Sequence, residues 1–229
     1  MAGEGRTLRL EYERPREVIS RTQRERVIDA MIVTVSEKGY QHTSVSDVIR
    51  AAGVSRKTYY EHFGDKQECF VAAYDLIVGH LLDDAGEVYA TETQWRHRIV
   101  AGLALILELL ASRPDLARFC VIEILAAGDA ALTRRDEVMR AFAQFLEPGR
   151  EEVPDGVEIS ELTAPAVVGG IYSIVYEEIR QERAEKLARL CPDLVYIALA
   201  PYIGPEEAAR ETGRLAASGR SRGRTRRAP

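Results

Sequence analysis

The sequence predicts an all-helical protein. Apolar residues recur at steps of three and four along most of the chain, and no stretch alternates strictly between apolar and polar residues. Capping residues and glycines divide this pattern into successive helices. Of the 229 residues, 46% are hydrophobic and 29% are charged, which is ordinary globular composition and excludes a largely disordered chain.

The first predicted helix begins after Thr22 and ends at Gly39. Thr22 and Glu25 have the spacing of a capping box, in which each side chain accepts a hydrogen bond from the other residue's backbone N–H. Glycine after the last apolar position is a common helix stop. The apolar face of this helix consists of Val27, Ile28, Met31, Ile32 and Val35.

Two short helices follow, with only two residues between them. Thr43 or Ser44 is expected to cap the first, which Gly53 ends, and Ser55 is expected to cap the second, residues 56 to about 63. A turn this tight needs a residue that tolerates positive φ, as glycine does. Two short helices joined in this way form a helix-turn-helix.

The rest of the chain is predicted as longer helices. A break at Gly64 and Asp65 precedes a helix that runs to about Tyr89. An acidic loop with proline and glycine, residues 147–159, lies further on. The remaining helices are expected at 95–110, from Pro114 through Leu125, at 132–146, at 162–190, and, after an interruption at Cys191 and Pro192, from an Asp193 cap through about Tyr202.

Charge is unevenly distributed along the chain, whose net charge is −5. Residues 1–62 hold 11 Lys or Arg and 9 Asp or Glu, residues 63–212 hold 14 and 27, and residues 213–229 hold 6 and none. An acidic body with basic ends suits nucleic-acid binding at one end, although many solvated surfaces are also uneven. The arginine-rich end is either a flexible phosphate binder or a solubilising segment without a role.

The third predicted helix carries residues suited to DNA. In a helix-turn-helix the second helix enters the major groove, and its first residues face base edges. Arg56 and Lys57 can donate to guanine, and Lys66, near the next helix start, can donate to a phosphate. The alternative is that the adjacent tyrosines are core residues and the charges are merely solvated. The candidates are Ser55, Arg56, Lys57, Thr58, Tyr59, Tyr60, His62 and Lys66.

The segment Thr43–Phe63 contains Ala-Gly-Val-Ser, Thr-x-Tyr and His-Phe at fixed spacing. With these motifs, the stretch from Thr22 to Phe70 resembles the DNA-binding domain of the tetracycline-repressor (TetR) family. Lys57 stands where that family most often has glycine, and Ile49 where it often has alanine. Because Lys57 adds a cation near the DNA, base preference is expected to differ from that of close relatives.

The resemblance implies a transcriptional regulator, a repressor that a small-molecule ligand releases from a pseudo-palindromic operator. It implies an all-helical homodimer with an N-terminal three-helix helix-turn-helix DNA-binding domain and a C-terminal helical domain for ligand binding and dimerisation. By position it makes Thr43, Ser44, Arg56, Lys57 and Tyr59 base-facing or groove-edge candidates, and Thr58, Tyr60, His62 and Lys66 phosphate-contacting candidates.

Four parts are therefore expected along the chain. They are a flexible arm at 1–19, the helix-turn-helix domain at 20–66, the effector-binding and dimerisation domain at 67–212, and a basic disordered tail at 213–229.

The C-terminal domain offers two weaker predictions. Its last two long helices, about 162–203, are apolar enough to pair with a second copy, and Ala166, Gly169 and Gly170 permit close approach; packing within one chain is the alternative. Aromatic and polar side chains could line an apolar cavity, the usual composition of a small-molecule site, unless they are plain core or solvated surface. The cavity candidates are Trp95, Phe119, Glu123, Met139, Phe142, Tyr172 and Tyr176, with His97 and Arg98 as further polar contacts.

Catalytic and metal chemistry finds no support in the sequence. The four histidines lack zinc-binding spacing, and no G-x-S-x-G motif or phosphate-binding glycine loop occurs. We expect no enzyme, no cofactor and no metal. The three cysteines show no C-x-x-C, and no signal peptide or spanning segment is seen, so a cytoplasmic protein is expected. The alternatives are an all-helical enzyme, and a helical protein-interaction module or ligand-binding protein without sequence-specific DNA binding.

Overall fold

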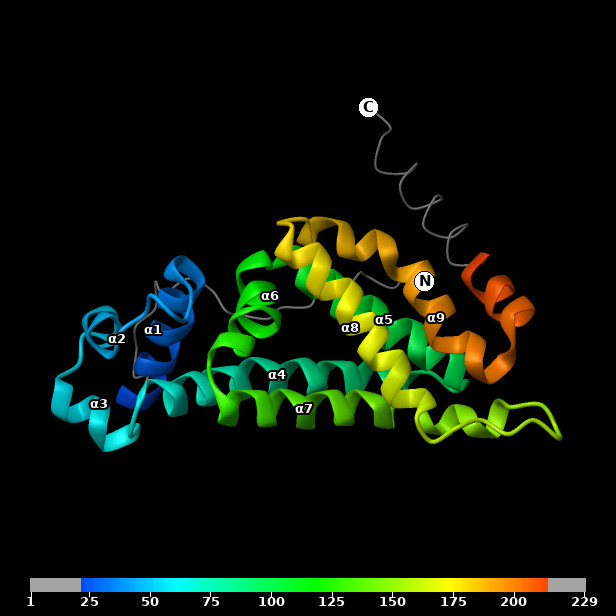
Figure 1. Ribbon diagram of the computed structural model, residues 1–229, viewed down its shortest axis with the longest axis horizontal. Coiled ribbons are helices and arrows are strands. Elements are labelled where there is room, and N and C mark those ends of the chain that lie inside the picture. The colour runs from blue at the N-terminus through cyan, green and yellow to red at the C-terminus, as the bar shows by residue number, and fades with distance from the viewer. Residues whose placement is uncertain (1–21, 214–229) are drawn as a thin grey trace, which may run out of the picture.

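The computed structural model describes residues 22–213, and every regular element in that range is helical, which confirms the predicted fold class. A small group of three helices, α1 to α3, lies at one end of an elongated bundle (Figure 1). We call these three helices the N-terminal unit and the remaining helices, from α4 on, the helical body. The expected arm at 1–19 and the tail beyond residue 213 lie outside the described residues.

The N-terminal unit forms where the capping signals predict it. Thr22 and Glu25 make the predicted capping box, in which the Glu25 carboxylate accepts from the Thr22 N–H at 2.8 Å. Ser44, rather than Thr43, caps the second helix, and Ser55 caps the third. The helices are α1 (Gln23–Lys38), α2 (Val45–Ala52) and α3 (Arg56–His62).

The tight turn between α2 and α3 depends on Gly53. Gly53 has φ 62° and ψ 38°, the left-handed conformation that the sequence predicts for this position. The guanidinium of Arg26 on α1 closes the turn from outside, donating to the carbonyls of Ala52 at 2.6 Å and Gly53 at 3.0 Å. These bonds satisfy carbonyls that the helix end leaves without partners.

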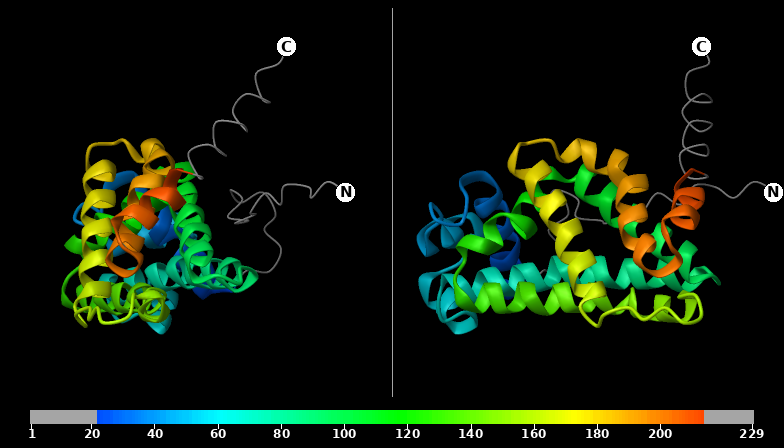
Figure 2. Two further views of the ribbon diagram at one scale, coloured as in Figure 1. Left: turned by 90° about the vertical axis from the view of Figure 1, so that its right-hand side faces the viewer. Right: turned by 45° about the vertical axis from the view of Figure 1, so that its right-hand side comes forward.

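The longest helix, α4 (Lys66–Thr91), belongs to both parts of the molecule. Asp65 caps it, and its first turns share a buried core with α1, α2, α3, α6 and α7. Within the helical body α4 and α7 lie side by side along the bundle, and α8 crosses them obliquely (Figures 1 and 2). The other helices are α5 (Trp95–Ser112), α6 (Pro114–Val121), α7 (Asp129–Gln144), α8 (Thr163–Arg180), α9 (Cys191–Ile203) and the 3-10 segments η1 (Glu123–Ala126), η2 (Glu147–Glu152) and η3 (Ala184–Leu190). Residues 205–213 are helical as well.

Three predicted boundaries in the helical body are wrong. The helix expected at 162–190 ends at Arg180, because Glu182 adopts φ 57° and the chain continues as a 3-10 segment. The expected break at Pro192 is instead the first turn of α9, where the missing N–H of proline costs nothing. The helix expected to reach Leu125 ends at Val121 and tightens into η1.

Candidate nucleic-acid interface and ligand cavity

Helix α3 has a buried face and an exposed face. Tyr59 and Phe63, four residues apart, pack into the core, and the Tyr59 hydroxyl donates to the carbonyl of Asp65 at 2.9 Å. Arg56 and Tyr60, also four residues apart, lie on the exposed face. The buried residues therefore fix which side of the helix faces outward.

The exposed face of α3 is cationic at its first turn. The Lys57 side chain is 87% exposed, and its ammonium lies 3.7 Å from the Glu61 carboxylate. The Arg56 guanidinium lies 5.6 Å from the centroid of the Tyr60 ring. Exposed pairs of this kind contribute little energy. Both cations can therefore exchange these contacts for a ligand on the outer face.

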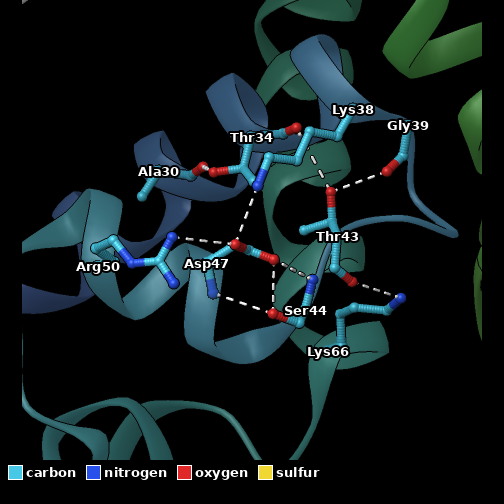
Figure 3. Close-up of polar contacts among 9 residues, drawn as sticks. All are labelled: Ala30, Thr34, Lys38, Gly39, Thr43, Ser44, Asp47, Arg50 and Lys66. Carbon is cyan, nitrogen blue, oxygen red and sulfur yellow. Dashed lines mark hydrogen bonds and ion pairs between the residues drawn. The ribbon is translucent and has the colours of Figure 1, made fainter.

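The start of α2 is organised around Asp47 (Figure 3). Its carboxylate accepts hydrogen bonds from the Ser44 hydroxyl at 2.6 Å and from the Lys38 ammonium at 3.0 Å. These bonds hold the pKa of Asp47 well below its usual range, and the bond from Ser44 has the largest effect. Arg50 lies 3.4 Å from the same carboxylate, and its side chain is 76% exposed, so α2 carries an exposed cation that the sequence predictions omit.

Lys66 links α4 to the loop before α2 (Figure 3). Its ammonium donates to the carbonyls of Tyr40 and Thr43, each at 2.9 Å, and lies 3.9 Å from the centroid of the Tyr40 ring. Burial lowers the pKa of Lys66. Two of its three N–H donors are thus committed inside the protein, which makes it a positioning residue for the loop.

The structure separates the predicted DNA-contacting residues by exposure. Thr43 is buried, and its hydroxyl donates to the carbonyl of Gly39 at 2.8 Å, so the expectation that its side chain faces a base is corrected. The expectation for Tyr59 is corrected for the same reason, because its ring is fully buried. Ser44, Ser55, Arg56, Lys57 and Tyr60 are exposed, while Thr58, His62 and Lys66 are half-buried.

An apolar cavity of about 180 Å³ lies in the helical body. Along α4 its wall runs from Tyr74 to Tyr89, which at 1.5 Å per residue is roughly 22 Å. The opposite walls come from α5, α7 and α8. The cavity is therefore long, narrow and lined mainly by aliphatic and aromatic side chains.

The two charged residues among the described ones that line the cavity are Arg98 and Arg135. The Nε of Arg98 donates to the carbonyl of Glu92 at 2.7 Å, and its guanidinium lies 5.2 Å from the centroid of the Tyr89 ring. The guanidinium of Arg135 lies 4.3 Å from the centroid of the Tyr172 ring. Arg98 was predicted as a polar contact of the cavity. Arg135 was not, because nothing in the sequence of its helix distinguishes it from exposed neighbours.

Three of the seven predicted cavity residues line it, namely Met139, Phe142 and Tyr172. The other four are placed elsewhere, which corrects the expectation for them. Trp95 packs against Tyr202 and donates to the carbonyl of Phe145 at 3.1 Å. Phe119 stacks on Phe70 with centroids 4.5 Å apart. Glu123 binds the N-terminal unit, Tyr176 is half-buried in the core between α8 and its neighbours, and His97 is exposed.

Helix α6 and η1 join the cavity to the N-terminal unit. Val121 lines the cavity, and its carbonyl accepts from the Tyr172 hydroxyl at 3.0 Å. Two residues later, the Glu123 carboxylate accepts from the backbone N–H of Tyr40 at 2.7 Å. Gln67 of α4 donates to the carbonyl of Ala127 at 2.7 Å. One short segment thus contacts both the cavity wall and the loop before α2.

Between residues 22 and 213, no group of three His, Cys, Asp or Glu side chains is placed to hold a metal ion. Burial raises the pKa of the Cys69 thiol and of the Cys120 thiol to about 12. Neither thiol is therefore a reactive thiolate at neutral pH. In the same range of residues, no helix is both long and apolar enough to cross a membrane.

The fold and sites define a protein with a helix-turn-helix at one end and a cavity of small-molecule size behind it. Residues 27–73 match the model of the family described as bacterial regulatory proteins, tetR family. This part of the chain, which includes the helix-turn-helix, is therefore similar to the DNA-binding region of that family.

Individual proteins are also similar to this chain. The chain is 32% identical over 72 residues to the uncharacterized HTH-type transcriptional regulator YvdT of Bacillus subtilis (strain 168), covering 31% of this chain and 37% of YvdT. It is 22% identical over 135 residues to the fatty acid metabolism regulator protein of the same organism, covering 59% and 70%. The structure of the regulator FadR from Bacillus subtilis in complex with stearoyl-CoA superposes with a TM-score of 0.67 at 18% identity, covering 77% and 98%.

Proposed function

We propose that this protein is a dimeric transcriptional regulator, a repressor that leaves its operator when a small apolar molecule enters the cavity. The proposal excludes a catalytic role and places the protein in the cytoplasm, beside the DNA. The observation that carries it is the exposed cationic turn of α3, with Arg56 and Lys57 held outward by the buried Tyr59. Phosphate contacts would set the position on DNA, and these two cations would read base edges.

A second copy would pair through α8 and α9. Leu162 is 72% exposed, and the exposed residues that follow on α8 at helical spacing are small, namely Ala166, Gly169 and Ser173. Gly169 and Gly170 have open space where a side chain would lie, which allows another backbone to approach closely. Tyr196 on α9 is 37% exposed. Two α3 helices on one dimer would then read the two halves of a pseudo-palindromic operator.

Ligand control would act through the elements shared between the cavity and the N-terminal unit. Helix α4 contributes a cavity wall and starts at Lys66, which holds the loop before α2. A ligand that favours one packing of α4 and α6 would change the separation of the two α3 helices. The resulting coupling, roughly 1 to 3 kcal/mol, acts equally on ligand and DNA affinity. The fatty acid metabolism regulator and the stearoyl-CoA complex among the similar proteins support an apolar effector.

Selection of duplexes from a random-sequence library by the full chain tests the proposal. We expect enrichment of an inverted repeat whose half-site centres are about 10 to 10.5 base pairs apart, or somewhat wider. Affinity for the enriched duplex should exceed that for scrambled duplex by at least about a thousandfold at physiological salt. Binding without sequence preference would contradict the proposal and favour the protein-interaction alternative.

A further inference from the structure

Arg135 has an unsatisfied donor at the edge of the apolar cavity. Its Nε is buried and has no hydrogen-bond partner among residues 22–213. Another nitrogen of the same guanidinium, Nη1, pairs with Asp136 at 2.8 Å, and the Asp136 side chain is 60% exposed. A buried N–H without an acceptor is costly, and native proteins rarely leave one. A ligand oxygen in the cavity would satisfy it.

The two arginines of the cavity differ in this respect. Arg98, near the far end of α4, already donates through its Nε to the carbonyl of Glu92. Arg135, near Tyr74, has no such acceptor for its Nε among the described residues. The polar end of a ligand is therefore expected at Arg135, and its apolar part along the wall from Tyr74 to Tyr89.

The groups around Arg135 suit an anion. Tyr74, Cys120 and Tyr172 line the cavity close to it. Burial raises the pKa of Tyr74 and that of Tyr172, so both stay neutral hydroxyl groups at pH 7. Burial disfavours the charge of Arg135, but interactions with the Tyr172 side chain and with Asp136 on its own helix raise the pKa of Arg135. Within the described chain, the cavity end thus carries a cation and no inward carboxylate.

We propose that the cavity binds a ligand with a long aliphatic chain and an anionic end group, and that Arg135 binds that end group through its Nε edge. This inference rests on the proposed function, since it names the class of the effector. The chain would lie along the roughly 22 Å wall of α4. A free carboxylate and the phosphates of an acyl thioester of coenzyme A share this chemistry.

An end group bound at Arg135 would lie beside a contact between α7 and α4. Arg134, the neighbour of Arg135, pairs with Asp75 of α4 at 2.5 Å. Asp75 lies nine residues after Lys66, roughly 13 Å along the same helix. A ligand bound at Arg135 therefore acts where α7 is tied to the part of α4 nearest the N-terminal unit.

Calorimetric titration of the full chain, without DNA, tests the inference with myristate, myristoyl-CoA and myristyl alcohol as probes. We expect at least one of the two anionic probes to bind about tenfold more tightly than the alcohol. Arg135→Gln should remove that advantage and leave alcohol binding within about twofold, and Arg135→Lys should restore part of it. Which anionic probe binds identifies the source of the charge.

Two matched variants complete the test. Arg140→Gln, on the exposed face of α7, should leave all affinities unchanged. Arg98→Gln should affect the anionic probes and the alcohol equally, because the end group lies at the opposite end. Any of three results overturns the inference. They are equal affinity for the anionic probes and the alcohol, a loss of affinity in Arg98→Gln that is confined to the anionic probes, and no binding of any probe. Because these titrations contain no DNA, operator selection still tests the proposed function by itself.

Discussion

The Glu123 carboxylate accepts a hydrogen bond from the backbone N–H of Tyr40 at 2.7 Å, although 83 positions separate the two residues. Glu123 is only 6% exposed, and its second oxygen lies 3.1 Å from the Nε of Arg118. The Tyr40 carbonyl in turn accepts from Lys66. A single buried carboxylate thus fixes the loop before α2 to the helical body.

Replacing Glu123 by alanine should destabilise the protein, because the buried N–H of Tyr40 loses its acceptor. We expect a loss of about 1 to 3 kcal/mol in the free energy of unfolding. In a chain of this length each kcal/mol lowers Tm by roughly 2 to 4 °C, which differential scanning calorimetry resolves. Glu206→Ala is the control, and since that side chain is 92% exposed its effect should be smaller. Equal Tm values for Glu123→Ala and the wild type would show that the bond is not formed.

The double substitution of Arg56 and Lys57 by alanine should abolish sequence-specific DNA binding. Both side chains are exposed on α3, and their removal leaves the buried Tyr59 face intact. Helicity by circular dichroism should therefore be unchanged. Gel-shift titration against the selected operator measures the loss, with Arg140→Ala on α7 as the charge control. Specific binding that survives the double change would remove α3 as the recognition helix.

The same substitution at two neighbouring tyrosines should have opposite effects. Tyr59→Phe removes a hydroxyl that donates to the Asp65 carbonyl, so the free energy of unfolding should fall by about 0.5 to 1.5 kcal/mol. Tyr60→Phe removes a hydroxyl from a residue that is 46% exposed, so stability should be unchanged and DNA affinity reduced. Urea unfolding and fluorescence anisotropy separate the two. A stability loss at Tyr60 would mean that its hydroxyl has an internal role.

The N-terminal unit could be predicted because its signals are local. Thr22, Ser44, Ser55 and Asp65 each cap the helix that follows them, and Gly53 adopts the positive φ that its turn requires. Cap geometry involves residues within about four positions, so the sequence carries it directly. What failed there was the exposure of Thr43 and Tyr59, since both side chains are buried. For Tyr59 the reason is that α1 and α4 set the two faces of a two-turn helix.

The cavity depends on contacts between distant segments, and the sequence carried little of it. Met139, Phe142 and Tyr172 were predicted because aromatic and flexible apolar residues are typical of such sites. Trp95 and Phe119 have the same character, yet their partners Tyr202 and Phe70 place them in the core. Glu123 was predicted as a polar residue of the cavity, but its partner lies 83 positions away, beyond any local pattern.

The stability that Asp47 contributes should disappear in acid. Its hydrogen bonds with Ser44 and Lys38 lower its pKa in the folded state, so it stabilises the fold above the unfolded value of about 4. That contribution is lost as the pH falls below about 4 towards the folded-state pKa. The difference in unfolding free energy between wild type and Asp47→Asn should therefore be largest at pH 7 and shrink by pH 3.

Urea unfolding at a series of pH values measures this difference for Asp47→Asn. Asp155→Asn, in the exposed loop after η2, provides a matched control substitution far from Ser44 and Lys38 in the chain. A constant difference across the series would indicate that the charge of Asp47 plays no part.

Substitutions of Lys66 and Lys57 test whether each lysine holds the loop before α2 in place or binds a DNA phosphate. The Lys66 ammonium donates to the carbonyls of Tyr40 and Thr43, so Lys66→Met should lower the free energy of unfolding by about 1 to 3 kcal/mol. It should weaken DNA binding without changing the salt dependence, because its donors face inward. Lys57→Met should leave the free energy of unfolding unchanged, because that side chain is 87% exposed. If Lys57 contacts a phosphate, the substitution should reduce the slope of log K against log salt by about 0.9. If Lys57 reads a base alone, the slope should stay the same. A slope that falls by about 0.9 in Lys66→Met would instead assign its third N–H to a phosphate, as the family resemblance implies.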